Sequence, residues 1–420
     1  DHAATDNGRP RSAGDPFTGV RNSLPGFGHR QSFLSLDPPR PRPGRAASLA
    51  SRFSALLAHS NLSRDSMPAR TGAGTGHGNW LRGIVDHETK REIHEFMENV
   101  TGVAHSRAGL LGNPSDGYGG KAIGLCLADL RAEVRIEPAD ALRIVGTGGA
   151  ERTFPSLLEN RGPFEGTARD DGTPLLHAAL NRFGLAHPEL ASRDPADPAL
   201  RFSIGFETNI PRQVGLAGSS AIVIAALRGL AQWFDVTLPP TLLAKLALEA
   251  ETEDLGIAAG PMDRIVQACE GLVAMDLAEP GNFSAYWALD PASLPPLFLA
   301  WDPRGGKPSG EAHGPLRERW RARDPEIMAT VEAFRNLVDE GLESLNRGDH
   351  AGFCDAMNRN LALRRKIFPV APADLQMAKL ATHHGASAKL SGSGGAVVGA
   401  VVGGPASEAD LHRLERAYRR

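Results

Sequence analysis

The chain has 420 residues, of which 41% are hydrophobic and 23% charged, and its formal net charge is −3. This composition is ordinary for a globular protein, and the small negative charge argues against nucleic acid as a main partner. The three cysteines (Cys126, Cys269 and Cys354) lie far apart, which predicts neither a zinc site nor a disulfide framework and suits a reducing compartment. No apolar run reaches about 18 residues, so we expect no membrane span.

Residues 1–80 differ in composition from the rest of the chain, being rich in Pro, Gly, Ser and Arg, as in "DPPRPRPGRAASLASR". Such a segment buries too little apolar surface to offset the entropy lost on ordering, so we predict a mostly disordered or targeting extension. Arg and Ser would suit a transit peptide, whereas several Asp residues argue against one. Met67 could be a start residue. The expected location is cytoplasmic, with a plastid as the alternative.

The following residues predict helices and strands, read here in chain order. A helix is expected over 84–100, followed by two short strands over 122–138 and helices over 155–162 and 173–186. Alternating Phe202, Ile204 and Phe206 predict a half-buried strand, which leads into a glycine-rich loop and a helix. The remaining expected elements are helices within 240–268, strands at 271–277 and 295–302, helices at 325–346, 350–365 and 374–386, a glycine-rich strand at 388–402 and a helix at 408–420. This order predicts an α+β fold with two lobes, residues 84–280 and 281–420.

The loop "NIPRQVGLAGSSAIV" is typical of an anion site. A strand, a glycine-rich turn and a helix start bring backbone N–H groups and the positive end of a helix dipole to one place. No Lys-Ser or Lys-Thr follows the last glycine, so the loop is not a Walker A motif, and it lacks the dinucleotide-binding pattern. The loop alone is equally consistent with a plain tight turn whose helix is capped by Ser219.

Two further glycine-rich stretches, "RAGLLGNPSDGYGG" from Arg107 and "KLSGSGGAVV" from Lys389, accompany that loop. Three such stretches in this order resemble the signature motifs of the GHMP small-molecule kinases. "GNPSD", "MNRNLALRRKIF" and "SGSGGAVV" resemble the plant-type glucuronokinase branch most. The resemblance spans about residues 106–402. It implies a two-lobed GHMP kinase fold whose C-terminal lobe is ferredoxin-like, with ATP and Mg²⁺ as cofactors and a small-molecule sugar acid as substrate.

The resemblance also implies residue roles. The ATP phosphates would lie on the loop of Pro211, Gly215, Leu216, Ala217, Gly218, Ser219 and Ser220, with Gly392 and Gly394 close against it. Ser220 and Glu251 would bind Mg²⁺, although Glu253 and Asp254 are near and acidic clusters are mostly solvated helix faces. Asp263 of "GPMDR" would be the general base, or an N-cap of the helix it precedes. Arg107 would keep that base ionised, whereas most arginines simply lie at the surface.

For the sugar, the resemblance implies Asp116 as a hydroxyl acceptor. Galactokinases have Glu-His where this chain has Asn113 and Pro114, and a neutral Asn113 would remove repulsion toward an acidic C6 group. The sugar carboxylate requires an arginine. Arg212, Arg264, Arg364 and Arg365 are candidates, and we favour Arg264 and Arg365. The last two in the chain could instead be cations at a helix C-terminus, where the dipole stabilises them.

The expected activity is the ATP-dependent phosphorylation of the anomeric hydroxyl of D-glucuronate, giving glucuronate 1-phosphate for UDP-glucuronate synthesis. The alternatives are a 1-kinase for galacturonate, galactose or fucose, a sugar sensor without turnover, and an unrelated α+β protein. Members of the family usually continue into a final strand of the C-terminal sheet, so truncation of the chain after residue 420 is a further expectation.

Overall fold

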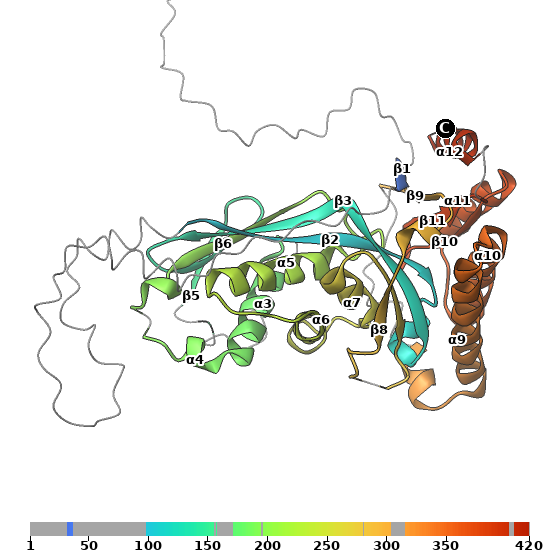
Figure 1. Cartoon of the computed structure of the whole chain (residues 1–420). Coiled ribbons are helices and arrows are strands. Elements are labelled where there is room, and N and C mark those ends of the chain that lie inside the picture. Colours follow the sequence, from blue (N-terminus) through green and yellow to red (C-terminus); the bar gives the residue numbers. More distant parts are fainter. Residues whose placement is uncertain are drawn as a thin grey trace, which may run out of the picture. The chain divides into compact units, whose positions relative to one another are not determined.

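The structure is a computed structural model, and it describes residues 32–36, 98–154, 157, 171–194, 196–279, 281–303, 316–402 and 407–419 (Figure 1). The strands are β1 (Ser32–Leu36), β2 (Val100–Leu111), β3 (Lys121–Pro138), β4 (Leu142–Val145), β5 (Glu151–Phe154), β6 (Phe202–Thr208), β7 (Leu272–Asp276), β8 (Tyr286–Leu289), β9 (Leu297–Trp301), β10 (Ser387–Leu390) and β11 (Ala396–Ala400). The α-helices are α3 (Thr173–Ala186), α4 (Pro188–Ala191), α5 (Gly218–Trp233), α6 (Pro240–Glu249), α7 (Met262–Cys269), α9 (Pro325–Asn346), α10 (His350–Ile367), α11 (Pro372–His383) and α12 (Ser407–Tyr418).

A seven-stranded sheet is built around β3. Strand β3 pairs with β2, with β6 through residues 132–138 and with β7 through residues 121–125. The prediction of two short strands over 122–138 is wrong, because one strand runs through the whole stretch. Its pairing with β2 jumps from Arg131 to Leu127, and this irregularity interrupts the apolar alternation in the sequence. Asn209 holds the irregular stretch, since its side chain bonds to the N–H of Arg131 and the carbonyl oxygen of Asp129.

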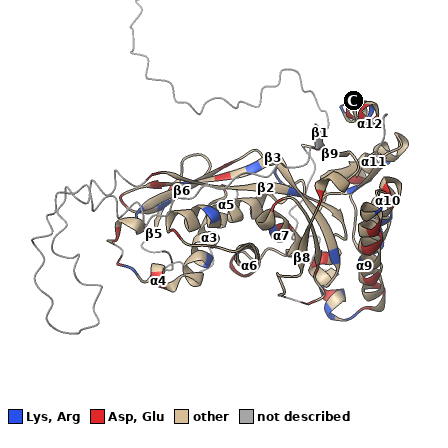
Figure 2. Cartoon of the chain, in the orientation of Figure 1, with Lys and Arg blue, Asp and Glu red and all other residues tan. Residues whose placement is uncertain are grey.

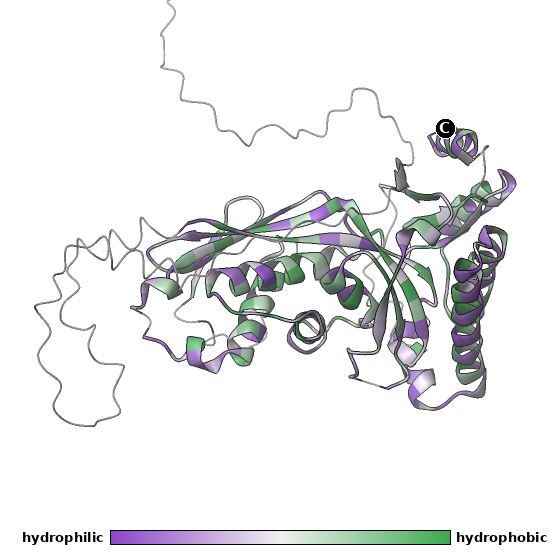
Figure 3. Ribbon diagram, viewed as in Figure 1, coloured by the Kyte–Doolittle hydropathy of each residue, from purple (hydrophilic) through white to green (hydrophobic). Residues whose placement is uncertain are grey.

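Helices α3, α5, α6 and α7 lie on one side of this sheet (Figure 1). Helix α5 packs against β2 and β3, and most of its residues are buried. Figure 3 shows hydrophobic residues along α5, as expected of a helix that is enclosed on nearly all sides. Burial of α5 positions the glycine-rich loop at its N-terminus.

The second sheet has the strand order β1-β9-β11-β10 and is antiparallel throughout. Strand β1 pairs with β9 from Ser32↔Trp301 to Leu36↔Leu297, so these five residues of the predicted disordered extension form a strand. Strand β8 pairs with β7, and the seven-stranded sheet therefore extends past the predicted lobe boundary at residue 281. The division of the chain into two lobes stays a prediction.

Most of the expected helices are confirmed, including those at 173–186 and 325–346 and the one that begins at His350. The glycine-rich strand expected over 388–402 is instead two strands, β10 and β11, joined by the loop of residues 391–395. Strand β2 is not among the expected elements, and it includes Arg107 at the start of the second glycine-rich stretch. The helix predicted over 84–100 lies outside the described residues except for its last three, of which Val100 begins β2, and most of the 155–162 helix also lies outside them.

Acidic and basic residues are interspersed over the helices and strands, as the small net charge suggests (Figure 2). The three cysteines are all free thiols. In the part of the chain that the structure describes, no helix has the length and apolar character needed to cross a membrane.

Candidate active site

The loop before α5 is held by polar contacts from neighbouring elements. Ser106 Oγ of β2 donates a hydrogen bond to Leu216 O at 2.7 Å, and Gln267 Nε2 of α7 donates to Ala217 O at 3.0 Å. Ala217, the residue before α5, has the left-handed φ of 57°. Within the described residues no side chain caps the N-terminus of α5, so the alternative of a helix capped by Ser219 is wrong. The first N–H groups of α5 thus keep the hydrogen-bonding capacity that an anion uses.

The third glycine-rich loop, residues 391–395, lies directly against this first loop. Gly215 has a φ of 72°, and a Cβ atom there would lie 2.8 Å from Gly394 O. A Cβ atom at Gly392 would overlap Gly215 O. The predicted close approach of the two backbones is confirmed, and it explains why glycine occurs on both sides of the contact.

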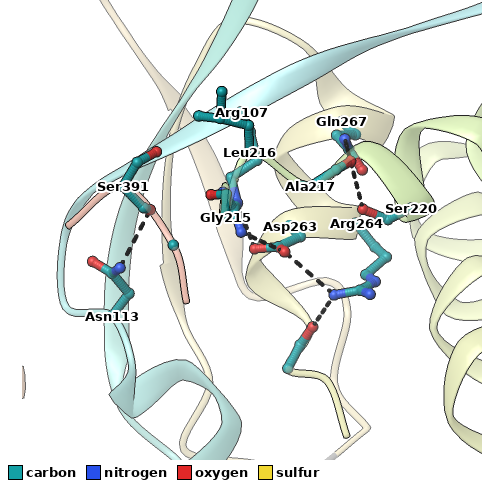
Figure 4. Close-up of polar contacts among 12 residues, drawn as sticks. Arg107, Asn113, Gly215, Leu216, Ala217, Ser220, Asp263, Arg264, Gln267 and Ser391 are labelled. Carbon is teal, nitrogen blue, oxygen red and sulfur yellow. Dashed lines mark hydrogen bonds and ion pairs between the residues drawn. The ribbon is translucent and has the colours of Figure 1, made fainter. Parts of the chain in front are cut away.

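The buried Arg107 and the half-buried Asp263 form an ion pair beside the two loops (Figure 4). Arg107 Nε and Nη2 each donate to one carboxylate oxygen of Asp263 at 2.5 Å, and Nη1 donates to Gly215 O at 2.8 Å. Arg107 is only 4% exposed, which excludes the surface arginine that its sequence alone allowed. Helix α7 begins at Met262 with Pro261 as its N-cap, so Asp263 is not the cap of that helix. The pair therefore links β2, the loop before α5 and the start of α7.

Asp116 lies next to that ion pair, in a short 3₁₀ turn (Ser115–Tyr118). It accepts a hydrogen bond from the N–H of Met262, and a Cβ atom at Gly260 would overlap its carboxylate. Burial, followed by the negative charge of Asp263, raises the pKa of Asp116 from 3.8 to about 6, against the opposing effect of Arg107. Two carboxylates and one guanidinium thus meet at one point, which is an arrangement typical of functional sites.

The raised pKa of Asp116 gives a pH-dependent expectation. If ionised Asp116 accepts a hydrogen bond from a sugar hydroxyl, kcat/KM for the sugar should rise with pH through about 6 and then level off. The Asp116→Asn variant should show a lower kcat/KM without this inflection, and steady-state assays between about pH 5 and pH 8 at saturating ATP would measure both profiles. An unchanged inflection in the variant would assign the inflection to another group.

The raised pKa of Asp116 affects folding stability in the opposite direction. The folded form binds more protons than the unfolded form between pH 3.8 and about 6, so the stability contributed by this group falls as pH rises through that window.

Glu251 is fully buried and lies in the π-helical turn Ala250–Asp254 (η4), next to the start of α5. Its Oε1 accepts from Ser219 Oγ at 2.7 Å, and its Oε2 accepts from Arg264 Nε at 2.7 Å and from Arg264 Nη2. Ser220, the predicted partner of Glu251, is also buried, but its hydroxyl donates to Ala217 O at 3.2 Å. The structure therefore brings Glu251 to Ser219 and Arg264.

The other two acids of the cluster point away from the loop. Arg182 of α3 donates to both oxygens of Asp254, at 2.6 and 2.8 Å, and pairs with Glu253 at 2.8 Å. Asp254 also accepts from Asn181 Nδ2 at 3.1 Å. These contacts face α3, so of the three candidate acids only Glu251 is directed to the start of α5.

The four candidate arginines have different settings. Arg212 and Arg365 are exposed. Arg264 is paired with Glu251 and lies 3.5 Å from Asp263. Arg364 is 2% exposed, donates to Gly392 O and Ser393 O at 2.9 and 3.1 Å, and has its pKa lowered by burial to about 10. Which arginine contacts a sugar carboxylate stays a prediction.

Asn113 is almost fully buried, and both ends of its amide contact the β10 end of the third loop. Its Nδ2 lies 3.4 Å from Leu390 O and from Ser391 O, as Figure 4 shows for Ser391, and its Oδ1 accepts from Lys389 Nζ at 2.5 Å. Asn360 of α10, fully buried, donates to Asn113 O at 3.1 Å and accepts from Gly112 N at 2.7 Å. Sequence reasoning gave no role to Asn360 or Lys389, although a lysine within the apolar run "AKL" was a usable signal.

Solved structures of several kinases share this arrangement of two sheets and helices. The mevalonate kinase of Methanococcus jannaschii aligns with a TM-score of 0.58 and 18% identity, over 75% of this chain and 94% of that chain. A Lactococcus lactis galactokinase, solved with galactose, aligns with a TM-score of 0.59 and 14% identity, over 79% and 92% of the two chains. At these identities the likeness shows the fold alone.

The family model "GHMP kinases N terminal domain" matches residues 179–271, which include the loop before α5, Glu251 and Asp263. This match, the shared fold and the two sequence relatives described next together show that the chain belongs to the GHMP kinases. It is a small-molecule kinase. Glucuronokinase 1 of Arabidopsis thaliana is 36% identical over 305 residues, which cover 70% of this chain and 82% of that protein. Probable glucuronokinase 2 of the same species is 35% identical over 312 residues, with the same coverage.

Proposed function

We propose that this chain is an ATP-dependent kinase that transfers a phosphoryl group to the anomeric hydroxyl of D-glucuronate. The observation that supports it most is the Arg107–Asp263 ion pair, which lies against Gly215 O at the junction of three glycine-rich segments. The two glucuronokinase relatives support the choice of sugar. The products are glucuronate 1-phosphate and ADP.

In the proposed mechanism Asp263 accepts the proton of the anomeric hydroxyl. The resulting oxygen forms a bond to the γ-phosphorus of ATP while the bond from that phosphorus to the oxygen of ADP breaks in line. Arg107 lies between the base and the loop, where its charge offsets the negative charge of the reacting groups. Backbone N–H groups at the start of α5 and the loop of Gly392 and Gly394 hold the phosphates. Asp116 accepts a hydrogen bond from the sugar and orients it.

Mg²⁺ is part of the proposal, and oxygen ligands of the kind it prefers are present at the start of α5. The carboxylate of Glu251 lies 2.7 Å from the hydroxyl of Ser219, and Ser220 follows in the same turn. A site with one carboxylate, hydroxyl groups and substrate phosphates is common for this ion. Glu251 and Ser220 would hold it, with Ser219 beside them. When bound, the ion supplies charge neutralisation on the ATP phosphates.

A panel of sugars tests the proposal. ADP release would be measured with D-glucuronate, galacturonate, galactose and fucose, and the position of the new phosphate would be determined by NMR. We expect the highest kcat/KM for glucuronate and a phosphate on the anomeric oxygen. A higher value for another sugar would reassign the substrate, and binding of ATP and sugar without ADP release would indicate a sensor. The predicted cytoplasmic or plastid location is a separate proposal.

A further inference from the structure

Lys389 of β10 is buried and has no ion-pair partner in the part of the chain that the structure describes. Its side chain is 1% exposed, and its Nζ donates to Asn113 Oδ1 at 2.5 Å, Gly109 O at 2.6 Å and Leu390 O at 2.8 Å. All three acceptors are neutral, and among the described residues no carboxylate forms an ion pair with it. Because a buried charge is costly unless it is paired, such a group calls for a functional explanation.

The contacts of Lys389 correspond to its charged form. A neutral amine donates two N–H groups, whereas Nζ here faces three close acceptors, which matches the three protons of an ammonium group. Burial and the neighbouring charges of Arg364 and Arg107 lower the pKa of Lys389 well below its ordinary value. These effects oppose the charged form that the three contacts indicate, so a bound anion nearby would stabilise the ammonium group.

The position of Lys389 relates it to the proposed sugar site. Two of its acceptors, Gly109 and Asn113, belong to β2 and to the turn that leads into Asp116. The negative charge of Asp116 is close enough to favour the protonated form of Lys389. Two other cations contact the proposed phosphate-binding loops: Arg364 bonds to Gly392 O and Ser393 O, and Arg107 bonds to Gly215 O.

We propose that Lys389 provides the positive charge that selects an acidic sugar, and that Asn113 must be a neutral amide because a carboxylate there would cancel this charge. The inference rests on the proposed function and adds the residues that determine its specificity. All three protons of Lys389 are already donated, so it acts through its electric field rather than by contact. Asn113 is a positioning residue, since it acts through Lys389.

The test compares D-glucuronate with D-glucuronamide, in which a neutral amide replaces the carboxylate. We expect the wild-type protein to prefer glucuronate, and Asn113→Asp and Lys389→Met each to lower the ratio of kcat/KM for the two sugars by about 10- to 100-fold. KM for ATP should stay within about threefold, because the change concerns the sugar. Each single variant changes the formal charge of the pair from +1 to 0 and the double variant changes it to −1, so the double variant should lose more selectivity than either single variant.

Lys379→Met is the matched control, because this lysine is exposed on the neighbouring helix α11 and should leave the ratio unchanged. If Lys389→Met does not fold, Asn113→Asp still tests the inference, since it keeps the lysine and nearly the same side-chain shape. An unchanged ratio in a folded Asn113→Asp variant would overturn the inference. An increase in KM for ATP that is the same with glucuronate and with glucuronamide would also overturn it. Absence of wild-type turnover with glucuronate would instead contradict the proposed function.

Discussion

Replacing Asp263 with Asn is expected to lower kcat by about 10²- to 10⁴-fold, because the amide cannot accept the proton of the sugar hydroxyl. ATP should still bind, since the phosphate-binding backbone does not include this side chain. A coupled assay of ADP release with glucuronate would measure kcat, and calorimetric titration would measure ATP binding.

The control for this variant is Asp355→Asn. The carboxylate of Asp355 lies on the exposed side of α10, and 65% of the side chain is accessible. Its kcat should match that of the wild type. Because Asp263 is also the partner of Arg107, thermal unfolding of both variants would show whether lost activity reflects lost structure. A decrease in kcat of less than about tenfold in a folded Asp263→Asn protein would exclude Asp263 as the general base.

Replacing Glu251 with Gln is expected to destabilise the protein by about 3–5 kcal/mol, because it removes the carboxylate that the buried guanidinium of Arg264 contacts most closely and leaves only Asp263, at 3.5 Å. The side chains of Arg264 and Glu251 are 5% and 0% exposed, so water cannot replace the lost partner. The melting temperature should fall by about 6 °C or more. Differential scanning calorimetry without nucleotide or metal would measure this effect separately from any role in catalysis.

Two further variants make the Glu251 experiment decisive. Glu253→Gln alters an acid only two residues away whose side chain is 58% exposed, and it should change stability by less than about 1 kcal/mol. The double variant Glu251→Gln, Arg264→Met should be more stable than Glu251→Gln alone, since it leaves no unpaired charge. Equal melting temperatures for Glu251→Gln and Glu253→Gln would show that the Arg264–Glu251 pair contributes little.

The family resemblance was sufficient to predict that the loop of residues 391–395 lies against the loop before α5, and the glycines that permit this contact can be read from the sequence. A Cβ atom at Gly215 would meet the backbone of Ser393 and Gly394, and a Cβ atom at Gly392 would overlap the backbone of Gly215, so both positions require glycine. The charge pair of Arg107 and Asp263 was likewise expected from the resemblance, although 156 positions separate the two residues.

The sequence could not show which of Ser219 and Ser220 faces Glu251, and the reason is geometric. Successive residues of an α-helix point about 100° apart, so the serine that faces Glu251 depends on where α5 begins. Its start at Gly218 follows from the left-handed conformation of Ala217, which Gln267 of a distant helix helps to hold. The π-turn of residues 250–254 similarly determines which acid points to the loop.

Contacts between segments far apart in the chain account for the other omissions. Lys389 bonds to Gly109, 280 positions earlier, and nothing near Lys389 in the sequence indicates that partner. Strand β1 is recognised by its pairing with β9 rather than by its composition. Strand β2 is buried along most of its length but includes His105, Ser106 and Arg107, whose polar character obscured a strand pattern.

The most direct test of the account is a crystal structure with a non-hydrolysable ATP analogue and D-glucuronate bound together. We predict the triphosphate against the backbone of residues 215–220 and the anomeric hydroxyl within hydrogen-bonding distance of the Asp263 carboxylate, which is about 2.6–3.2 Å. A nucleotide bound elsewhere, or a sugar whose anomeric oxygen points away from Asp263, would contradict the proposed kinase mechanism.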